Sequence, residues 1–168
     1  MTEAKQPEAL YAAAPNPRPE AIVVHCSDPR FQGALREFLE RGLGLETGGY
    51  VPVVVAGGVP VLARPYLLPQ EFRFLRERFE RHRTDFPSLR RLILINHEDC
   101  RYYEMLKSRG LAFFGMHLHG ADLPRADLAE AAKACAELLA HLGLEIELHH
   151  ARFADAEHRR VKIDRVWT

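Results

Sequence analysis

The sequence has no excess of either charge, because 23 basic and 23 acidic side chains among 168 residues give a formal net charge of zero. It also has no apolar run long enough to cross a membrane, and its first residues do not form an apolar leader. A neutral chain lacks the basic surface that attracts nucleic acid or an anionic membrane. We therefore expect neither of these partners, and we predict a cytoplasmic protein.

Cysteine is scarce as well, with Cys26, Cys100 and Cys135 as the three examples. Three cysteines cannot all pair, and a reducing compartment argues against a framework of disulfides. Cys135 falls on the apolar face of a helix that we expect to run from residue 122 or 125 to residue 141, which indicates a core position. Metal binding or packing therefore explains the cysteines better than disulfide bonding.

Strand-like and helix-like segments alternate along the chain. Apolar runs predict buried strands, and segments with helical spacing lie between them. This alternation predicts an α/β fold, with a mainly parallel four-stranded sheet flanked by helices and a fifth, C-terminal strand that is antiparallel. At this length one domain is the simplest organisation, so we predict an N-terminal arm over residues 1–20, which hold four prolines, and a single α/β domain over residues 21–168. The expected strands cover residues 21–26, 51–55, 90–96, 144–148 and 161–167.

Two of the expected strands run directly into residues that bind metals. The first leads into Cys26-Ser-Asp28-Pro-Arg30, and the third leads into His97-Glu-Asp-Cys100. Ligands of open parallel sheets bind outside the carboxyl ends of the strands, so these residues are expected at one edge of the sheet. Two thiolates and one imidazole suit Zn²⁺, and three protein ligands leave a fourth position, as in catalytic sites. We predict that Cys26, His97 and Cys100 bind Zn²⁺, which makes the α/β domain a zinc-binding domain.

Asp28 and Arg30 lie close enough to Cys26 to act at the fourth zinc position. Asp28 could accept a hydrogen bond from a zinc-bound hydroxide, or it could serve as a conditional fourth ligand. A bidentate ion pair with Arg30 would decide between these roles. The pair could also be purely structural, with Asp28 capping a helix that begins near Phe31, and capping is compatible with catalysis. We predict Asp28 and Arg30 as the catalytic residues.

With these motifs the sequence resembles the β-class carbonic anhydrases and is similar to a divergent member of that family. The Cys-x-Asp-x-Arg and His-x-x-Cys motifs of the family match residues 26–30 and 97–100, within a resemblance that covers residues 20–105. The resemblance implies a zinc lyase, a carbonate dehydratase, that hydrates carbon dioxide reversibly to bicarbonate by means of zinc-bound hydroxide. It also implies an Asp28–Arg30 dyad that orients this hydroxide, and a homodimer or higher homo-oligomer.

Two segments depart from the family pattern. Val54-Val55-Ala56-Gly57 stands where the family has Arg-Asn-Ala-Gly, and Arg101 replaces the glycine expected after Cys100. The strand end becomes apolar, and the bulkier residues after Cys100 could narrow the cleft, or Arg101 could supply a positive charge for an anion. Two alternatives therefore stay open: a zinc protein that acts on another small electrophile, such as carbon disulfide or carbonyl sulfide, or a non-catalytic zinc-binding module.

A further pair of histidines, His117 and His119, lies in a connection rich in glycine and phenylalanine. The alternating spacing could bind a metal on a strand, but the absence of a carboxylate at suitable spacing favours a loop. We interpret both as loop residues. The connection at residues 112–120 could still overhang the cavity and supply a proton shuttle.

Overall fold

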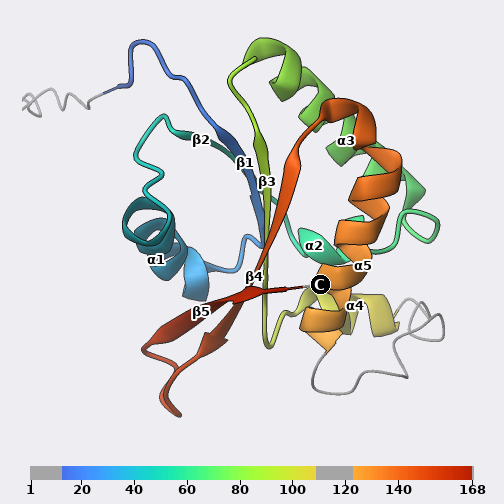
Figure 1. The fold of residues 1–168 in the computed structure, drawn as a ribbon. Coiled ribbons are helices and arrows are strands. Elements are labelled where there is room, and N and C mark those ends of the chain that lie inside the picture. Colours follow the sequence, from blue (N-terminus) through green and yellow to red (C-terminus); the bar gives the residue numbers. More distant parts are fainter. Residues whose placement is uncertain (1–12, 109–122, 168) are drawn as a thin grey trace, which may run out of the picture.

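The computed structural model describes residues 13–108 and 123–167, which form a five-stranded sheet covered by helices on both faces (Figure 1). The strand order is β2-β1-β3-β4-β5. β1 pairs in parallel with β2 and β3, β3 pairs in parallel with β4, and β4 pairs antiparallel with β5. The predicted α/β fold, with four parallel strands and an antiparallel C-terminal strand, is confirmed. The strands are β1 (Ala21–His25), β2 (Tyr50–Val54), β3 (Arg91–His97), β4 (Glu145–Phe153) and β5 (Val161–Val166).

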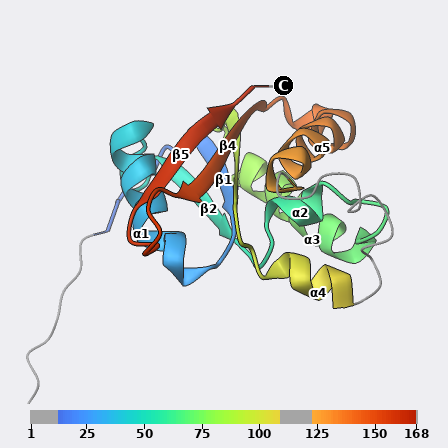
Figure 2. The ribbon, with the colours of Figure 1, turned by 90° about the horizontal axis from the view of Figure 1, so that it is seen from below.

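The helices divide unequally between the two faces of the sheet (Figures 1 and 2). One face carries α1 (Pro29–Glu37) and the π-helical turn η1 (Phe38–Gly42) that continues it. The opposite face carries α2 (Val59–Leu62), α3 (Pro69–Asp85), α4 (Tyr102–Ser108), α5 (Leu123–Leu138) and the short 3₁₀ helix η5 (Ala140–Leu142). Among the described residues, none of these helices has the length and apolar character needed to span a membrane.

Two hydrophobic cores lie on the two sides of the sheet, because successive residues of a strand point to opposite faces. In β1, Ile22 and Val24 belong to the larger core beneath α3 and α5, whereas Val23 belongs to the core beneath α1. Burial on both faces explains why β1 and β3 are almost continuously apolar. Cys135 of α5 is buried in the larger core, which confirms its predicted position.

β2 is less buried than its sequence suggests. The β-branched run at residues 51–55 predicts a buried strand, but β2 lies at the edge of the sheet. Only Val53 of this strand is fully buried, and Val54 is 43% exposed. Pro52 fits an edge, where a residue without a backbone N–H interrupts no ladder with a further strand. The prediction of a buried strand was wrong because burial here depends on strand order rather than on local composition.

The proposed division into an arm and a domain stays a prediction. Residues 1–12, most of the expected arm, lie outside the described residues, and residues 13–20 contain no helix or strand.

Candidate metal centre

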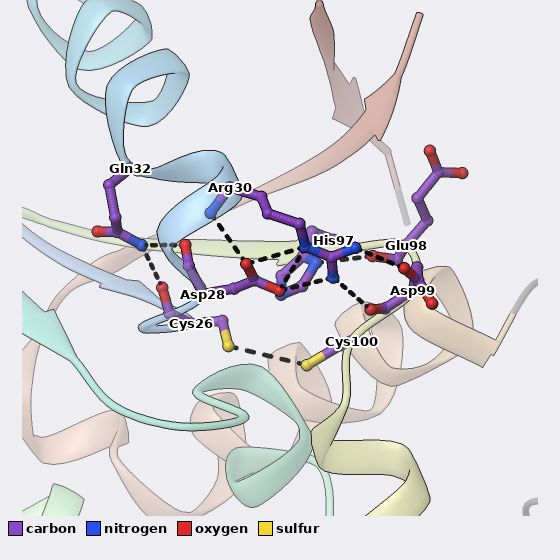
Figure 3. A network of polar contacts seen from close by, with 8 residues as sticks. All are labelled: Cys26, Asp28, Arg30, Gln32, His97, Glu98, Asp99 and Cys100. Carbon is purple, nitrogen blue, oxygen red and sulfur yellow. Dashed lines mark hydrogen bonds and ion pairs between the residues drawn. The ribbon is translucent and has the colours of Figure 1, made fainter. Parts of the chain in front are cut away.

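The ends of β1 and β3 bring the predicted zinc ligands together. His25, the last residue of β1, pairs with Ile95 of β3, so the two loops that follow begin at neighbouring strand ends. The sulfur atoms of Cys26 and Cys100 are 3.8 Å apart, and a ring nitrogen of His97 completes a group whose donor atoms all lie within 4.8 Å of one another (Figure 3). All three side chains are buried. The structure therefore assembles the donor set that the two motifs predict.

His97 has the tautomer that a metal ligand needs. Its Nδ1 lies 2.7 Å from the backbone carbonyl of Glu98, which can only accept, so Nδ1 carries the proton and Nε2 has a free lone pair. Nε2 is buried and has no hydrogen-bond partner among the described residues. Buried polar atoms without partners are rare in proteins and require an explanation. A metal ion beside the two sulfurs provides one, and a carbonyl bonded to the other ring nitrogen is the usual support for such a ligand.

The two thiols share a proton in the protein without metal. The hydrogen bond from Cys100 lowers the pKa of Cys26 to about 4, and backbone amides of Gly57 and Asp28 also favour this thiolate. The same contact, together with burial, raises the pKa of Cys100 above its usual value. A divalent cation binds thiolates, so binding would displace the remaining proton. Two thiolates would balance the charge of Zn²⁺.

Asp28 and Arg30 form the predicted pair. The Asp28 side chain caps α1 by accepting a hydrogen bond from the backbone N–H of Arg30 at 3.0 Å. The guanidinium donates through Nη2 to Oδ2 at 2.7 Å and through Nε to both carboxylate oxygens at 3.1 and 3.2 Å. These hydrogen bonds hold the pKa of Asp28 below its usual value. The capping role and the ion pair therefore coexist, and the carboxylate is directed to Arg30 rather than included among the metal-donor group.

Asp99, in the loop after β3, and Gln32, in α1, contribute contacts that the motifs alone do not indicate. Asp99 accepts from Arg30 Nη1 through its carboxylate at 2.6 Å and from Nη2 through its backbone carbonyl at 2.9 Å. Gln32 of α1 donates to the backbone carbonyls of Cys26 and Asp28 at 2.9 and 2.8 Å. Arg30 and Asp99 are 69 residues apart, so no local spacing in the sequence could reveal their contact.

A buried polar network stabilises the loop that follows β3. Asn96 accepts from the backbone N–H of His97 at 3.0 Å and donates to the hydroxyl of Tyr103 at 2.9 Å. That hydroxyl donates to Asp127 of α5 at 2.9 Å, and Asp127 forms a bidentate ion pair with Arg64 at 2.5 and 2.7 Å. The network connects the strand that carries His97 to α4, α5 and the segment after α2.

A cavity of about 500 Å³ opens beside the candidate ligands. Its polar side includes Cys26, Asp28, Arg30 and Cys100, and its apolar side includes Ala56, Tyr102 and Met105. Of the two departures from the family pattern, Arg101 lines this cavity, whereas Val54 and Val55 are not among its lining residues. Ala56 and Gly57, which match the pattern, also line it. Val54 instead lies on the exposed edge of the sheet. His117, His119 and the rest of residues 112–120 lie outside the described residues, so their interpretation stays a prediction.

No protein-family model and no curated protein matches the sequence. Several solved structures are similar to this chain over most of their length. They are β-carbonic anhydrases. Isoform I from Trichomonas vaginalis has 17% identity, covers 94% of this chain and 87% of its own, and has a TM-score of 0.49. A tetrameric enzyme from Sordaria macrospora has 15% identity, covers 88% and 81%, and has a TM-score of 0.44. The β-carbonic anhydrase CcaA has 17% identity, covers 90% and 84%, and has a TM-score of 0.41.

Proposed function

We propose that the protein is a zinc-dependent lyase that converts carbon dioxide and water reversibly to bicarbonate. The observation that supports this most directly is His97 Nε2, a buried nitrogen with a free lone pair beside two cysteine sulfurs. Sulfur and imidazole nitrogen are the donors that zinc prefers. When bound by three protein ligands, zinc makes a water molecule nucleophilic at neutral pH. Cys26, His97 and Cys100 would hold it.

In this proposal Asp28 and Arg30 orient the reacting water. Arg30 fixes the Asp28 carboxylate at the wall of the cavity through three donated hydrogen bonds. A carboxylate accepts hydrogen bonds, so Asp28 would accept one from the water and direct the oxygen lone pair at the substrate. Ala56, Tyr102 and Met105 form an apolar wall, which suits an uncharged substrate such as carbon dioxide. Arg101 at the same cavity supplies a positive charge for an anionic product.

Stopped-flow hydration of carbon dioxide by the zinc-loaded protein tests this reaction. We expect a rate above that of buffer between pH 6.5 and 9, because the chain holds both a ligand set and an orienting carboxylate. Asp28→Asn should retain one zinc per chain but lose about 100-fold or more in rate, as expected when an oriented proton acceptor is removed. Asp85→Asn is the matched control, because Asp85 forms an exposed ion pair with Arg81 on α3. One zinc per chain with no rate above buffer at any of these pH values would contradict the proposed reaction.

A second candidate keeps the zinc site and changes the electrophile. The apolar wall of the cavity and the loss of the family's polar strand end at Val54-Val55 favour a less polar molecule, such as carbon disulfide or carbonyl sulfide. Faster turnover of either molecule than of carbon dioxide would support this candidate. The non-catalytic alternative requires Asp28 to occupy the fourth zinc position permanently, which zinc-bound structures at several pH values would show.

We also propose a homodimer or higher homo-oligomer in the cytoplasm. The assembly rests on the Cys26 and His97 motifs, whose resemblance to the β-class carbonic anhydrases implies association of identical chains. A reducing compartment suits two cysteines that must stay free to bind a metal.

A further inference from the structure

Arg30 joins the two loops that carry the candidate ligands (Figure 3). Its Nε and Nη2 donate to the Asp28 carboxylate, and its Nη1 and Nη2 donate to the carboxylate and backbone carbonyl of Asp99. Asp28 follows Cys26 after β1, whereas Asp99 lies between His97 and Cys100 after β3. A single guanidinium therefore ties together the two loops from which all three ligands come.

Asp99 has a backbone conformation that few residues adopt. Its φ is 51°, and His158 is the other non-glycine residue of the described chain with positive φ. Aspartate tolerates this left-handed region better than most residues. At Asp99 the turn presents both the carboxylate and the carbonyl of one residue to Arg30. Rare backbone conformations of this kind cluster at functional sites, which points to a role for Asp99 beyond connecting His97 to Cys100.

We propose that Asp99 is a positioning residue that anchors Arg30 and thereby keeps Asp28 from occupying the fourth position of the bound metal. The inference rests on the proposed zinc site. A carboxylate two residues after Cys26 is an acceptable zinc ligand, yet Asp28 forms a fork with Arg30 and lies outside the group of metal-donor atoms. Because Asp99 fixes the guanidinium, Arg30 cannot follow Asp28 toward the metal. Asp28 would have to give up its hydrogen bonds from Arg30 to become a ligand.

Asp99 contributes more to the position of Asp28 than to the stability of the fold. The Asp99 side chain is 66% exposed, and exposed ion pairs add little to stability because water screens them. The Asp28 side chain is only 10% exposed. Arg30 is therefore held by an exposed carboxylate, that of Asp99, and positions a buried one, that of Asp28. Loss of the Asp99 carboxylate should therefore leave unfolding almost unchanged. Arg30 would keep its hydrogen bond to the Asp99 backbone carbonyl but lose the ion pair, so it could move with Asp28 more readily.

Azide binding to the cobalt-loaded full-length protein tests this role, because visible absorption of Co²⁺ reports a change in its ligands. We expect azide to bind the wild type and to bind Asp99→Asn about ten-fold more weakly, which corresponds to Asp28 filling the fourth position nine-tenths of the time. Asp28→Ala in the Asp99→Asn background should restore azide binding, because the competing carboxylate is gone. Asp85→Asn, which removes an exposed aspartate paired with Arg81, should bind azide like the wild type.

Equal azide affinity of Asp99→Asn and the wild type would overturn the inference, as would a failure of Asp28→Ala to restore binding. A wild type that binds no cobalt, or binds cobalt but no azide, would also overturn it. The experiment contains no carbon dioxide. If the azide affinities are as expected but the zinc-loaded protein does not hydrate carbon dioxide, the proposed reaction is contradicted and the proposed role of Asp99 is not.

Discussion

Gly57 shows how closely the loops around the candidate metal centre approach one another. It follows β2 with a φ of 80°, and a Cβ placed on it would lie 2.5 Å from the ring of Tyr102. Its backbone amide also stabilises the Cys26 thiolate. Only glycine satisfies the backbone angle, the close contact with Tyr102 and the approach to the sulfur at once. The aromatic ring that lines the cavity is therefore packed against a residue without a side chain.

Replacing Gly57 by alanine should destabilise the protein by about 2 kcal/mol or more, because the left-handed backbone and the Tyr102 ring both oppose a Cβ. Urea unfolding measures this change. Gly33→Ala is the control, because Gly33 lies in α1 with φ outside the left-handed region and with open space where the Cβ would stand. That variant should gain up to about 1 kcal/mol from better helix propensity. Equal stabilities of the two variants would contradict the close packing at Gly57.

For individual residues, the sequence predicts the metal donors better than it predicts the long-range contacts around them. Cys26, His97 and Cys100 can be predicted because they lie at or just after the ends of two apolar strands, and the spacing within each motif is short. The contacts of Asp99 and of the Arg64–Asp127 ion pair could not be predicted, because the partners are more than 60 residues apart in the chain. Such contacts depend on how helices and strands pack, which local patterns do not contain.

Among the secondary-structure elements, β3 and β4 are joined by a buried ion pair in addition to their backbone ladder. Arg91 donates to both oxygens of Glu147 at 2.5 and 3.1 Å and also to Glu20 at 2.7 Å. The hydrogen bonds from Arg91 lower the pKa of Glu147 below its usual 4.5, and the positive charge of Arg165 acts in the same direction. His149 lies 3.8 Å from the same carboxylate, and burial lowers its pKa, which favours its neutral form.

The lowered pKa of Glu147 predicts how stability depends on pH. Its stabilising effect is fully present above the pKa of the unfolded chain, near 4.5, and is lost as pH falls through the lower pKa of the folded protein. Glu147→Gln should therefore be less stable than the wild type at pH 7, by about 2 kcal/mol, because Arg91 would lose its hydrogen bonds to a charged carboxylate and keep only the more exposed Glu20 as an ion-pair partner. The difference should shrink below pH 4.5. Thermal unfolding from pH 3 to pH 7 measures it, and a pH-independent difference would contradict the role of the carboxylate charge.

The order and type of most elements follow from the sequence, but their exposure does not. The alternation of apolar strands and amphipathic helices predicts the α/β class and the antiparallel last strand, both of which the structure has. The edge position of β2 and the four-residue α2 are absent from that prediction. A short apolar segment has no periodicity to reveal a helix, and local composition does not distinguish an edge strand from a central one.

In the whole molecule, the sheet grows on both sides of β1, because β2 is added at one edge and β3 at the other. β2 pairs with one edge of β1 and β3 with the opposite edge, so the connections after β1 and β3 lead away in different directions at the carboxyl end of the sheet. Such a reversal of strand order leaves a crevice, which is where open α/β sheets bind their ligands. The strand order (Figure 1) therefore brings together the motifs that begin at Cys26 and His97, which are 71 residues apart in the chain.

The zinc content of the purified full-length protein shows whether Cys26, His97 and Cys100 bind a metal. We expect one zinc per chain in the wild type and in Cys135→Ala, because Cys135 lies in the core away from the cluster of donor atoms. Cys26→Ala, the matched removal of a thiol from that cluster, should lower zinc affinity by at least about 100-fold. Equal zinc content in Cys26→Ala and the wild type, or no zinc in a wild type refolded with the metal, would contradict the assignment of Cys26, His97 and Cys100 as a metal site.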